Sequence, residues 1–334
     1  MESLEKSEYH LLKNITKDAY IPFNQEVNSF CLFESIDKIL YLLYANEECS
    51  IISFDLINDK RINEIKKAHS NYISSFRHYL DGINKRDLIL SVSIKNNNVK
   101  VWNIKNYECL CNIQNIYESS VRLSACFLNE DNNIFIVACN EPFKIFEETK
   151  VFDLNGKKCK EIYNYDELTL YIDSYCDKNL SKNFIITGNI SYPRSYDYSS
   201  SKLYHKYSDD NNKEQFYMSI FDKDDILKLI ESSSDKFIRI WDFHSGKLLN
   251  KIKLDFTEYC RVYSFCVSNN NFLFGGALKK IIVIDLKTQK VDSFSCGYQE
   301  ARTIKIIEHP IFGECLILQG NSQINLWIRE EKNL

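Results

Sequence analysis

The hydrophobic and polar positions of this chain alternate over short distances. Short runs of Ile, Leu, Val, Phe and Tyr recur about every ten residues, between turns rich in Asn, Asp, Ser and Lys. Clear runs are residues 39–44, 87–92, 134–137, 184–187 and 316–318. This spacing is typical of strands in an all-β sandwich, barrel or propeller. Segments with a helical period are nearly absent, so we expect little helix.

A longer repeat decides between these architectures. The best copy spans residues 232–249, and its key position is Trp241, on the third of four expected strands. Weaker copies place the key position 43 to 50 residues apart along the chain. The seven key residues are Phe54, Trp102, Phe152, Tyr196, Trp241, Ile284 and Trp327. A repeat of about 40–45 residues with four strands is one propeller blade. We therefore predict an all-β, seven-bladed propeller of four-stranded antiparallel blades, forming a single domain over residues 1–334.

The segment 232–249 resembles a WD40 repeat, and the seven registers extend that resemblance over nearly the whole chain. Residues 309–327 also resemble the last repeats of WD40 proteins from ciliated protists, and the Asn- and Ile-rich composition fits such an AT-rich eukaryote. The resemblance implies a buried chain of His, Ser or Thr, Trp and a turn Asp in each complete repeat. We expect such a chain in one blade at most, since no His precedes the fifth blade. The residues that match the repeat signature are His69, Asn96, Trp102, Asp235, Trp241, Asp242, Asn321 and Trp327.

Closure of the ring needs a strand from the other end of the chain. Trp327 lies seven residues before the last residue, which leaves no room for the outer strand of the seventh blade. The β-rich segment 9–15 can supply it, so we predict that residues 1–20 provide this outer strand and remove the open sheet edge.

Three segments depart from the repeat. Residues 81–85 extend the second blade and residues 141–150 lengthen the third. Residues 191–212 form a polar linker rich in Tyr, Ser and Asp, which makes the fourth blade the least regular one in this interpretation.

Composition and charge narrow the classes of function. The chain is 44% hydrophobic with a net charge of −4, which argues against disorder and against binding to nucleic acid or an anionic membrane. No apolar stretch is long enough to span a membrane, and the charged N-terminal residues do not resemble a secretory signal. We therefore expect an intracellular, cytoplasmic protein. The 12 cysteines are scattered and indicate buried apolar side chains rather than disulfides or a metal site. Cys109 and Cys111 share one face of an expected strand, so a metal site there is the alternative.

No catalytic motif is present. The chain lacks GxSxG, HExxH, GxGxxG and phosphate-loop sequences, and its six histidines are spread over several expected blades. Acidic pairs such as Asp209-Asp210 are typical of solvated turns. We expect no enzyme activity, no cofactor and no metal.

Binding of other proteins or peptides is the favoured function. The WD40 resemblance implies a peptide-binding face built from residues before each first strand and beside the turn Asp. The matching positions are Tyr72, Lys95, Phe216, Ser234, Arg261 and Arg302. Arg261 and Arg302 belong to adjacent blades, and together they could hold an acidic or phosphorylated peptide. A monomeric ring within a larger complex fits this interpretation.

Two alternatives remain open. One is a substrate receptor of a cullin-type ubiquitin ligase. Such receptors carry Trp-Asp-x-Arg, whereas residues 241–244 here end in His244. The other is a structural subunit of a large ciliary or ribosomal assembly. A propeller that binds phosphoinositides would need an Arg-Arg pair, which the sequence lacks.

Overall fold

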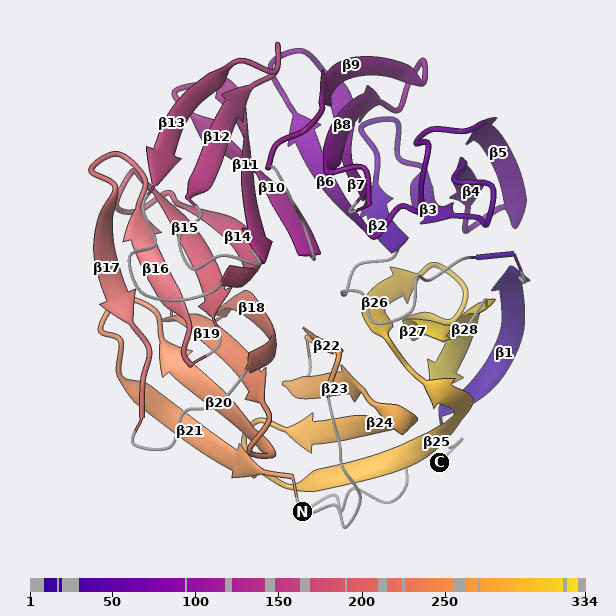
Figure 1. The fold of residues 1–334 in the computed structure, drawn as a ribbon. Helices are drawn as coiled ribbons and strands as arrows, with labels where there is room; N and C mark the ends of the chain where they lie inside the picture. Colours follow the sequence, from indigo (N-terminus) through magenta and orange to yellow (C-terminus); the bar gives the residue numbers. More distant parts are fainter. Residues whose placement is uncertain are drawn as a thin grey trace.

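The computed structural model describes residues 9–16, 18–19, 30–93, 95–117, 122–141, 148–162, 169–189, 191–209, 215–223, 226–254, 262–269, 271–320 and 323–329. These residues form seven four-stranded antiparallel sheets arranged around a central opening (Figure 1). The predicted seven-bladed propeller is therefore confirmed. No helix in the described part of the chain has the length and apolarity needed to cross a membrane.

The strands follow the chain in blade order. Blades 1 to 3 are β2 (Phe30–Glu34), β3 (Leu40–Ala45), β4 (Ile51–Asp55), β5 (Lys60–Ile65); β6 (Ser75–Asp81), β7 (Arg86–Ser93), β8 (Asn98–Asn103), β9 (Glu108–Ile113); β10 (Arg122–Glu130), β11 (Asn133–Glu141), β12 (Thr149–Asp153), β13 (Lys158–Ile162). Blades 4 to 6 are β14 (Thr169–Asp177), β15 (Lys182–Asn189), β16 (Arg194–Asp197), β17 (Lys202–Lys206); β18 (Gln215–Lys223), β19 (Ile226–Ser233), β20 (Phe237–Asp242), β21 (Leu248–Lys253); β22 (Ser264–Val267), β23 (Phe272–Gly276), β24 (Leu278–Asp285), β25 (Val291–Glu300). Blade 7 is β26 (Thr303–His309), β27 (Gly313–Gly320), β28 (Gln323–Arg329) and β1 (Tyr9–Thr16).

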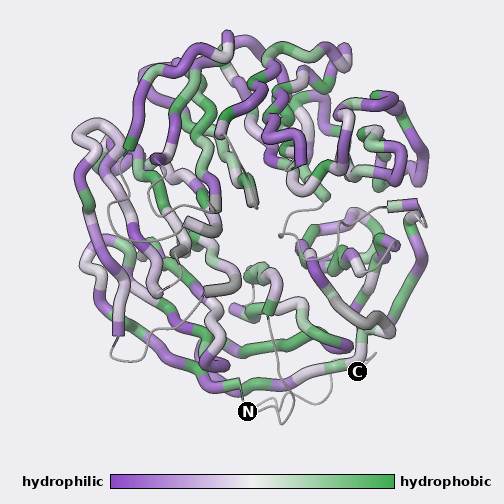
Figure 2. Tube along the Cα trace, viewed as in Figure 1, coloured by the Kyte–Doolittle hydropathy of each residue, from purple (hydrophilic) through white to green (hydrophobic). Residues whose placement is uncertain are grey.

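All seven key positions lie on the third strand of their blades, as the repeat predicts. The five apolar runs lie on second strands, where they are buried between neighbouring blades. Several outer strands, such as β5 and β13, are mostly hydrophilic (Figure 2). Strands near the centre of the ring are therefore apolar and strands at its rim are polar, because only the inner strands of each blade are covered on both faces.

Closure by the N-terminal strand is confirmed. β1 pairs antiparallel with β28, with Leu11 opposite Trp327, and the two lie side by side in Figure 1. The Tyr9 hydroxyl donates to Glu314 Oε1 at 3.2 Å across 305 residues of sequence. The seventh sheet therefore joins the two ends of the described chain.

The fourth blade is regular, and the interpretation of residues 191–212 as a linker was wrong for residues 191–209, the part that the structure describes. This segment contains β16 and β17. Its tyrosines made it look polar, but the rings of Tyr196, Tyr198 and Tyr207 are buried. Residues 81–85 form the turn between β6 and β7, and of the insertion at 141–150 residues 142–147 lie outside the described part.

The antiparallel order of the strands in each blade places the connections between them on two opposite faces of the ring. Connections from first to second and from third to fourth strand lie on one side, which we call the turn face. Connections from second to third strand and from blade to blade lie on the other side, which we call the loop face.

Candidate functional site

Blade 2 contains the best-formed signature of the repeat. The Trp102 indole N–H donates to Ser91 Oγ at 2.8 Å, and Ser91 Oγ lies 2.7 Å from His69 Nε2. All three side chains are buried. Burial lowers the pKa of His69 to about 3, so its imidazole is neutral at physiological pH. A neutral ring tied to a serine inside the sheet serves to satisfy polar groups there.

The turn residue of this blade differs from the prediction. Asn96 was expected to complete the chain, but its amide donates to Ser70 Oγ at 2.8 Å near the surface. Asn98 lies next to His69 instead, where it acts to raise the pKa of the imidazole. The reason is the fold of the turn, which places Asn98 rather than Asn96 at the buried start of β8.

Blade 5 replaces this arrangement with charged groups. Glu231 stands opposite Arg239 in the sheet, at the position where blade 2 pairs Ser91 with Lys100. The Arg239 guanidinium is fully buried and lies 2.9 Å from Asp209, 3.7 Å from Glu231 and in an ion pair with Asp235. Asp209 comes from the connection before β18, as His69 comes from the connection before β6.

Burial and ion pairing shift the pKa values of the acidic groups in this cluster. Burial raises the pKa of Glu231 to about 8, against the influence of Arg239 and of the Trp241 indole. Hydrogen bonds from Arg239 and Ser233 hold the pKa of Asp235 below its usual value, although burial acts to raise it. Lys251 Nζ lies 2.7 Å from Asp209. Asp235 of the sequence signature thus belongs to a buried ionic cluster, and Trp241 lies on the same strand as its Arg239.

The signature is incomplete in blade 7. Leu318 occupies the position of Ser91, since it lies opposite Asn325, two residues before Trp327. The Trp327 ring packs against Phe294, with centroids 6.1 Å apart. Asn321 lies outside the described residues.

The residue after each key position has a separate role. Asp242 Oδ1 accepts a hydrogen bond from the Ser245 amide at 2.7 Å and thereby fixes the turn to the fourth strand. Such side-chain bonds to the turn backbone occur in blades 1 to 6, from Asp55, Asn103, Asp153, Asp197, Asp242 and Asp285. In blade 7 the position is Ile328, and β1 supplies the fourth strand.

Four of the six residues expected to bind peptides lie in connections of the loop face: Tyr72, Lys95, Ser234 and Arg302. Lys95 Nζ lies 5.3 Å from the centroid of the Tyr72 ring, so the structure brings these two together. The Arg302 guanidinium lies 5.9 Å from the Tyr263 ring centroid in the connection before β26. Ser234 is half-buried between β19 and β20. Phe216 belongs to β18 and its side chain is not described, and Arg261 lies outside the described residues, so the proposed Arg261–Arg302 pair stays a prediction.

The first strands carry a set of equivalent inner positions that the sequence did not reveal. In blade 2, Phe76 of the first strand lies opposite Ser91, and the next residue is Arg77. The equivalent residues of blades 1 to 7 are Cys31, Arg77, Cys126, Asp173, Ser219, Cys266 and Lys305. These side chains influence one another electrostatically around the opening. Lys305 and Arg77 both act on Cys31, and Arg77 and Asp173 both act on Cys126. Burial nevertheless raises the pKa of Cys31 to about 12, so its thiol stays protonated.

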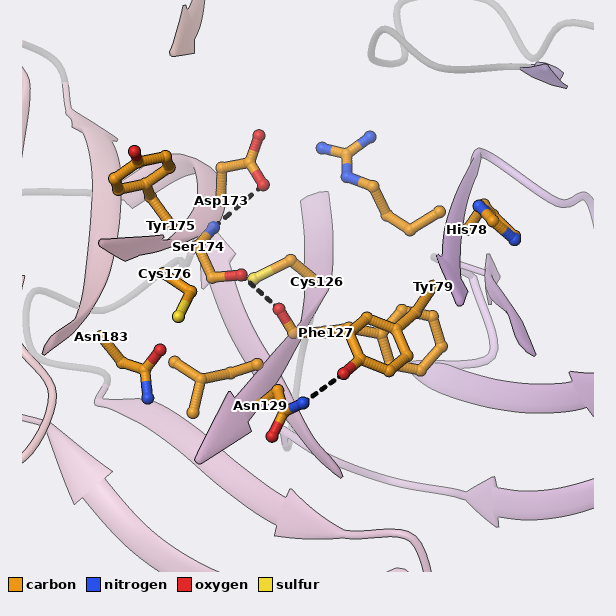
Figure 3. A pocket seen from close by; sticks show the side chains of 12 residues that line it. His78, Tyr79, Cys126, Phe127, Asn129, Asp173, Ser174, Tyr175, Cys176 and Asn183 are labelled. Carbon is orange, nitrogen blue, oxygen red and sulfur yellow. Dashed lines mark hydrogen bonds between the residues drawn. The ribbon is translucent and has the colours of Figure 1, made fainter. Parts of the chain in front are cut away.

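A cavity of about 270 Å³ lies beside this set, between blades 2, 3 and 4. Tyr79 and Phe127 line one side of it and Cys126, Asp173 and Ser174 line the other (Figure 3). Arg77 also lines it and donates to the Tyr171 hydroxyl at 3.0 Å; that hydroxyl donates to Asp173 Oδ2 at 3.1 Å. The phenol therefore bridges a half-buried cation and a carboxylate.

Exposed apolar side chains gather on the turn face. Of the ten large hydrophobic residues that are exposed in the described part, four lie singly on outer strands of different blades. The others lie in or beside turns between first and second strands: Ile36, Leu80, Ile83, Leu180, Ile311 and Phe312. Five of these six belong to the adjacent blades 7, 1 and 2. Sequence analysis missed them, although apolar residues inside turns were a visible signal.

The cysteines differ in part from expectation. Cys109, Cys159 and Cys176 are exposed, whereas six others are buried. Cys109 and Cys111 both lie on β9, and within the described ranges no group of three or more His, Cys, Asp or Glu side chains gathers as a metal site would require.

Comparison with protein-family models and with curated proteins finds no match for this chain.

Proposed function

We propose that this protein is a non-catalytic interaction scaffold of the WD40-repeat type, which binds other proteins or peptides inside the cell. The observation that carries the proposal is the gathering of exposed Ile, Leu and Phe side chains in the turns of one face. Contiguous exposed apolar groups on a rigid frame are typical of protein-binding surfaces. The buried groups of blades 2 and 5 fit a structural role, because they hold the frame rather than face a substrate.

The geometry gives less support to a cullin-type receptor. His244 stands where such receptors carry an exposed Arg. Its Nε2 pairs with Asp177 of blade 4 at 3.0 Å, and its Nδ1 lies 3.3 Å from the Tyr204 hydroxyl. Both ring nitrogens are thus engaged within the propeller, so this side chain links two blades.

Affinity purification at near-native expression tests the scaffold function. We would compare the unchanged chain, a loop-face variant (Tyr72→Ala/Arg302→Ala) and a turn-face variant (Ile36→Ser/Phe312→Ser). Leu203→Ser/Leu249→Ser, on outer strands, is the matched control. The proposal is supported if stoichiometric partners are lost from one of the two face variants and are still captured by the control variant. Enrichment of no partner, or equal capture by all four chains, contradicts it.

A further inference from the structure

Five exposed large apolar side chains lie in or beside the first turns of the adjacent blades 7, 1 and 2. Ile311 is 74% exposed and Ile83 is 61% exposed, and Leu80, Phe312 and Ile36 lie between 37% and 48%. We call these five residues the apolar arc. Large apolar groups on three successive blades form one surface if the turns between them are continuous.

Two contacts support that continuity. The Ile36 amide donates to Asp87 Oδ2 at 2.9 Å, and Asp87 lies directly opposite Leu80 in the sheet of blade 2. Beneath the turns of blades 7 and 1, one hydrophobic cluster joins Ile307 to Leu32 and Leu40. The turns that carry the arc therefore rest on shared packing and cannot move apart as independent loops.

The charges around the arc are unequal. Glu34 and Arg86 are neutralised within their own turns, by Lys38 at 2.7 Å and by Asp81 at 2.8 Å. Exposed Asp37 follows Ile36, and exposed Glu308 lies three residues before Ile311, whereas exposed Lys85 lies at the blade 2 end. Exposed Arg329, opposite Tyr9 at this end of blade 7, is offset by Glu314, which accepts from the Tyr9 hydroxyl. The part of the arc on blades 7 and 1 thus presents acidic groups beside apolar ones.

The backbone at the arc decides the form of the occupant. A bound strand would need an open strand edge with free peptide groups, but the arc consists of turns at strand ends. A helix presents an apolar stripe that meets separate side chains without backbone pairing.

We propose that the apolar arc is the docking surface for an amphipathic helix of a partner protein, whose apolar stripe is bordered by Lys or Arg. This inference rests on the proposed scaffold function and assigns it a face and a partner chemistry. Apolar burial supplies the affinity, and the basic border places the helix over Asp37 and Glu308.

Fluorescence anisotropy with two labelled peptides tests this proposal. Each is a helix of about 18 residues with the same Leu stripe, bordered by Lys in one and by Glu in the other. We expect the Lys peptide to bind more tightly, with an affinity that falls as salt rises. Ile36→Ser/Phe312→Ser should weaken it at least about tenfold. Asp37→Asn/Glu308→Gln should weaken it about threefold, since exposed pairs contribute little. Leu203→Ser/Leu249→Ser should leave it unchanged.

Three outcomes of the measurements on the purified protein would overturn the proposal. The first is equal binding of the Glu peptide, and the second is equal weakening by the control variant. The third is a concentration-dependent dimer of the unchanged chain that the arc variant abolishes, which would make a second copy the occupant. Matching circular dichroism and melting temperatures establish that each variant is folded. If partners captured in the cell survive the arc variant and are lost from the loop-face variant, this inference fails while the scaffold function stands.

Discussion

Arg77 of blade 2 donates to the hydroxyl of Tyr171 in blade 4, 3.0 Å away, and so spans the innermost strand of blade 3. The same guanidinium lies 5.4 Å from the Tyr171 ring centroid. Cys126, on the first strand of blade 3, is also within the electrostatic influence of Arg77. The contact therefore couples blades that do not share a sheet interface.

Tyr171→Phe tests the energetic weight of this bridge. Loss of the hydroxyl leaves Arg77 and Asp173 without their shared partner, so we expect a loss of about 1–3 kcal/mol in the free energy of unfolding. Urea denaturation measures it. A double-mutant cycle with Arg77→Met should show a coupling of about 1 kcal/mol. Strictly additive effects would mean that the bridge contributes nothing beyond packing.

His69 makes the fold sensitive to acid. Its pKa is about 3 in the folded chain and near 6.5 when unfolded, so the unfolded state binds the extra proton between these values. Stability is fully present above pH 6.5 and falls as the pH drops, by up to about 1.4 kcal/mol per pH unit from this residue. His69→Gln should reduce the slope between pH 6 and 4 measured by urea denaturation. An unchanged slope would assign the acid sensitivity to other groups, such as His78.

Glu231 produces the opposite dependence. Its carboxyl has a pKa of about 8 when folded and near 4.5 when unfolded, so the folded chain retains a proton that the unfolded chain releases. Its contribution to stability therefore decreases as the pH rises from 4.5 to 8. Relative to the unchanged chain, Glu231→Gln should gain about 1 kcal/mol per pH unit in this window. Exposed Glu308→Gln is the control and should show no such trend. Identical pH profiles for Glu231→Gln and the unchanged chain would contradict burial as the cause.

Removal of β1 should affect the whole ring. Deletion of residues 1–20 opens the seventh sheet and exposes the edge of β28, so we expect a loss of about 3 kcal/mol or more and a tendency to aggregate. Deletion of residues 1–8 stops before β1 and is the matched control. If both deletions melt together with the full chain, closure by β1 does not support the fold.

The blades could be predicted because a short pattern of neighbouring residues recurs on the third strand of every blade. Trp102, Phe152 and Tyr196 differ in chemistry, but each is a large aromatic side chain followed directly by Asn or Asp. Closure by β1 followed from the short distance between Trp327 and the last residue.

The remaining features depend on contacts between distant blades. Arg77 and Tyr171 lie 94 residues apart, and no local pattern marks either one. The ionic cluster of blade 5 was hidden because Glu231 occupies a serine position, although a glutamate inside an apolar strand was a signal. Asn96 was misassigned because a fixed offset from Trp102 cannot anticipate how the turn places its side chains.

The pairing of β1 with β28 has a consequence for biosynthesis. During translation β1 leaves the ribosome long before its partner strand β28 is made, since Tyr9 and Glu314 lie 305 positions apart in the sequence. The first six blades can assemble in order while the ring of the nascent chain is still open. The final step is then the pairing of β1 with β28, so the ring can close only after the last strand of the seventh blade has left the ribosome.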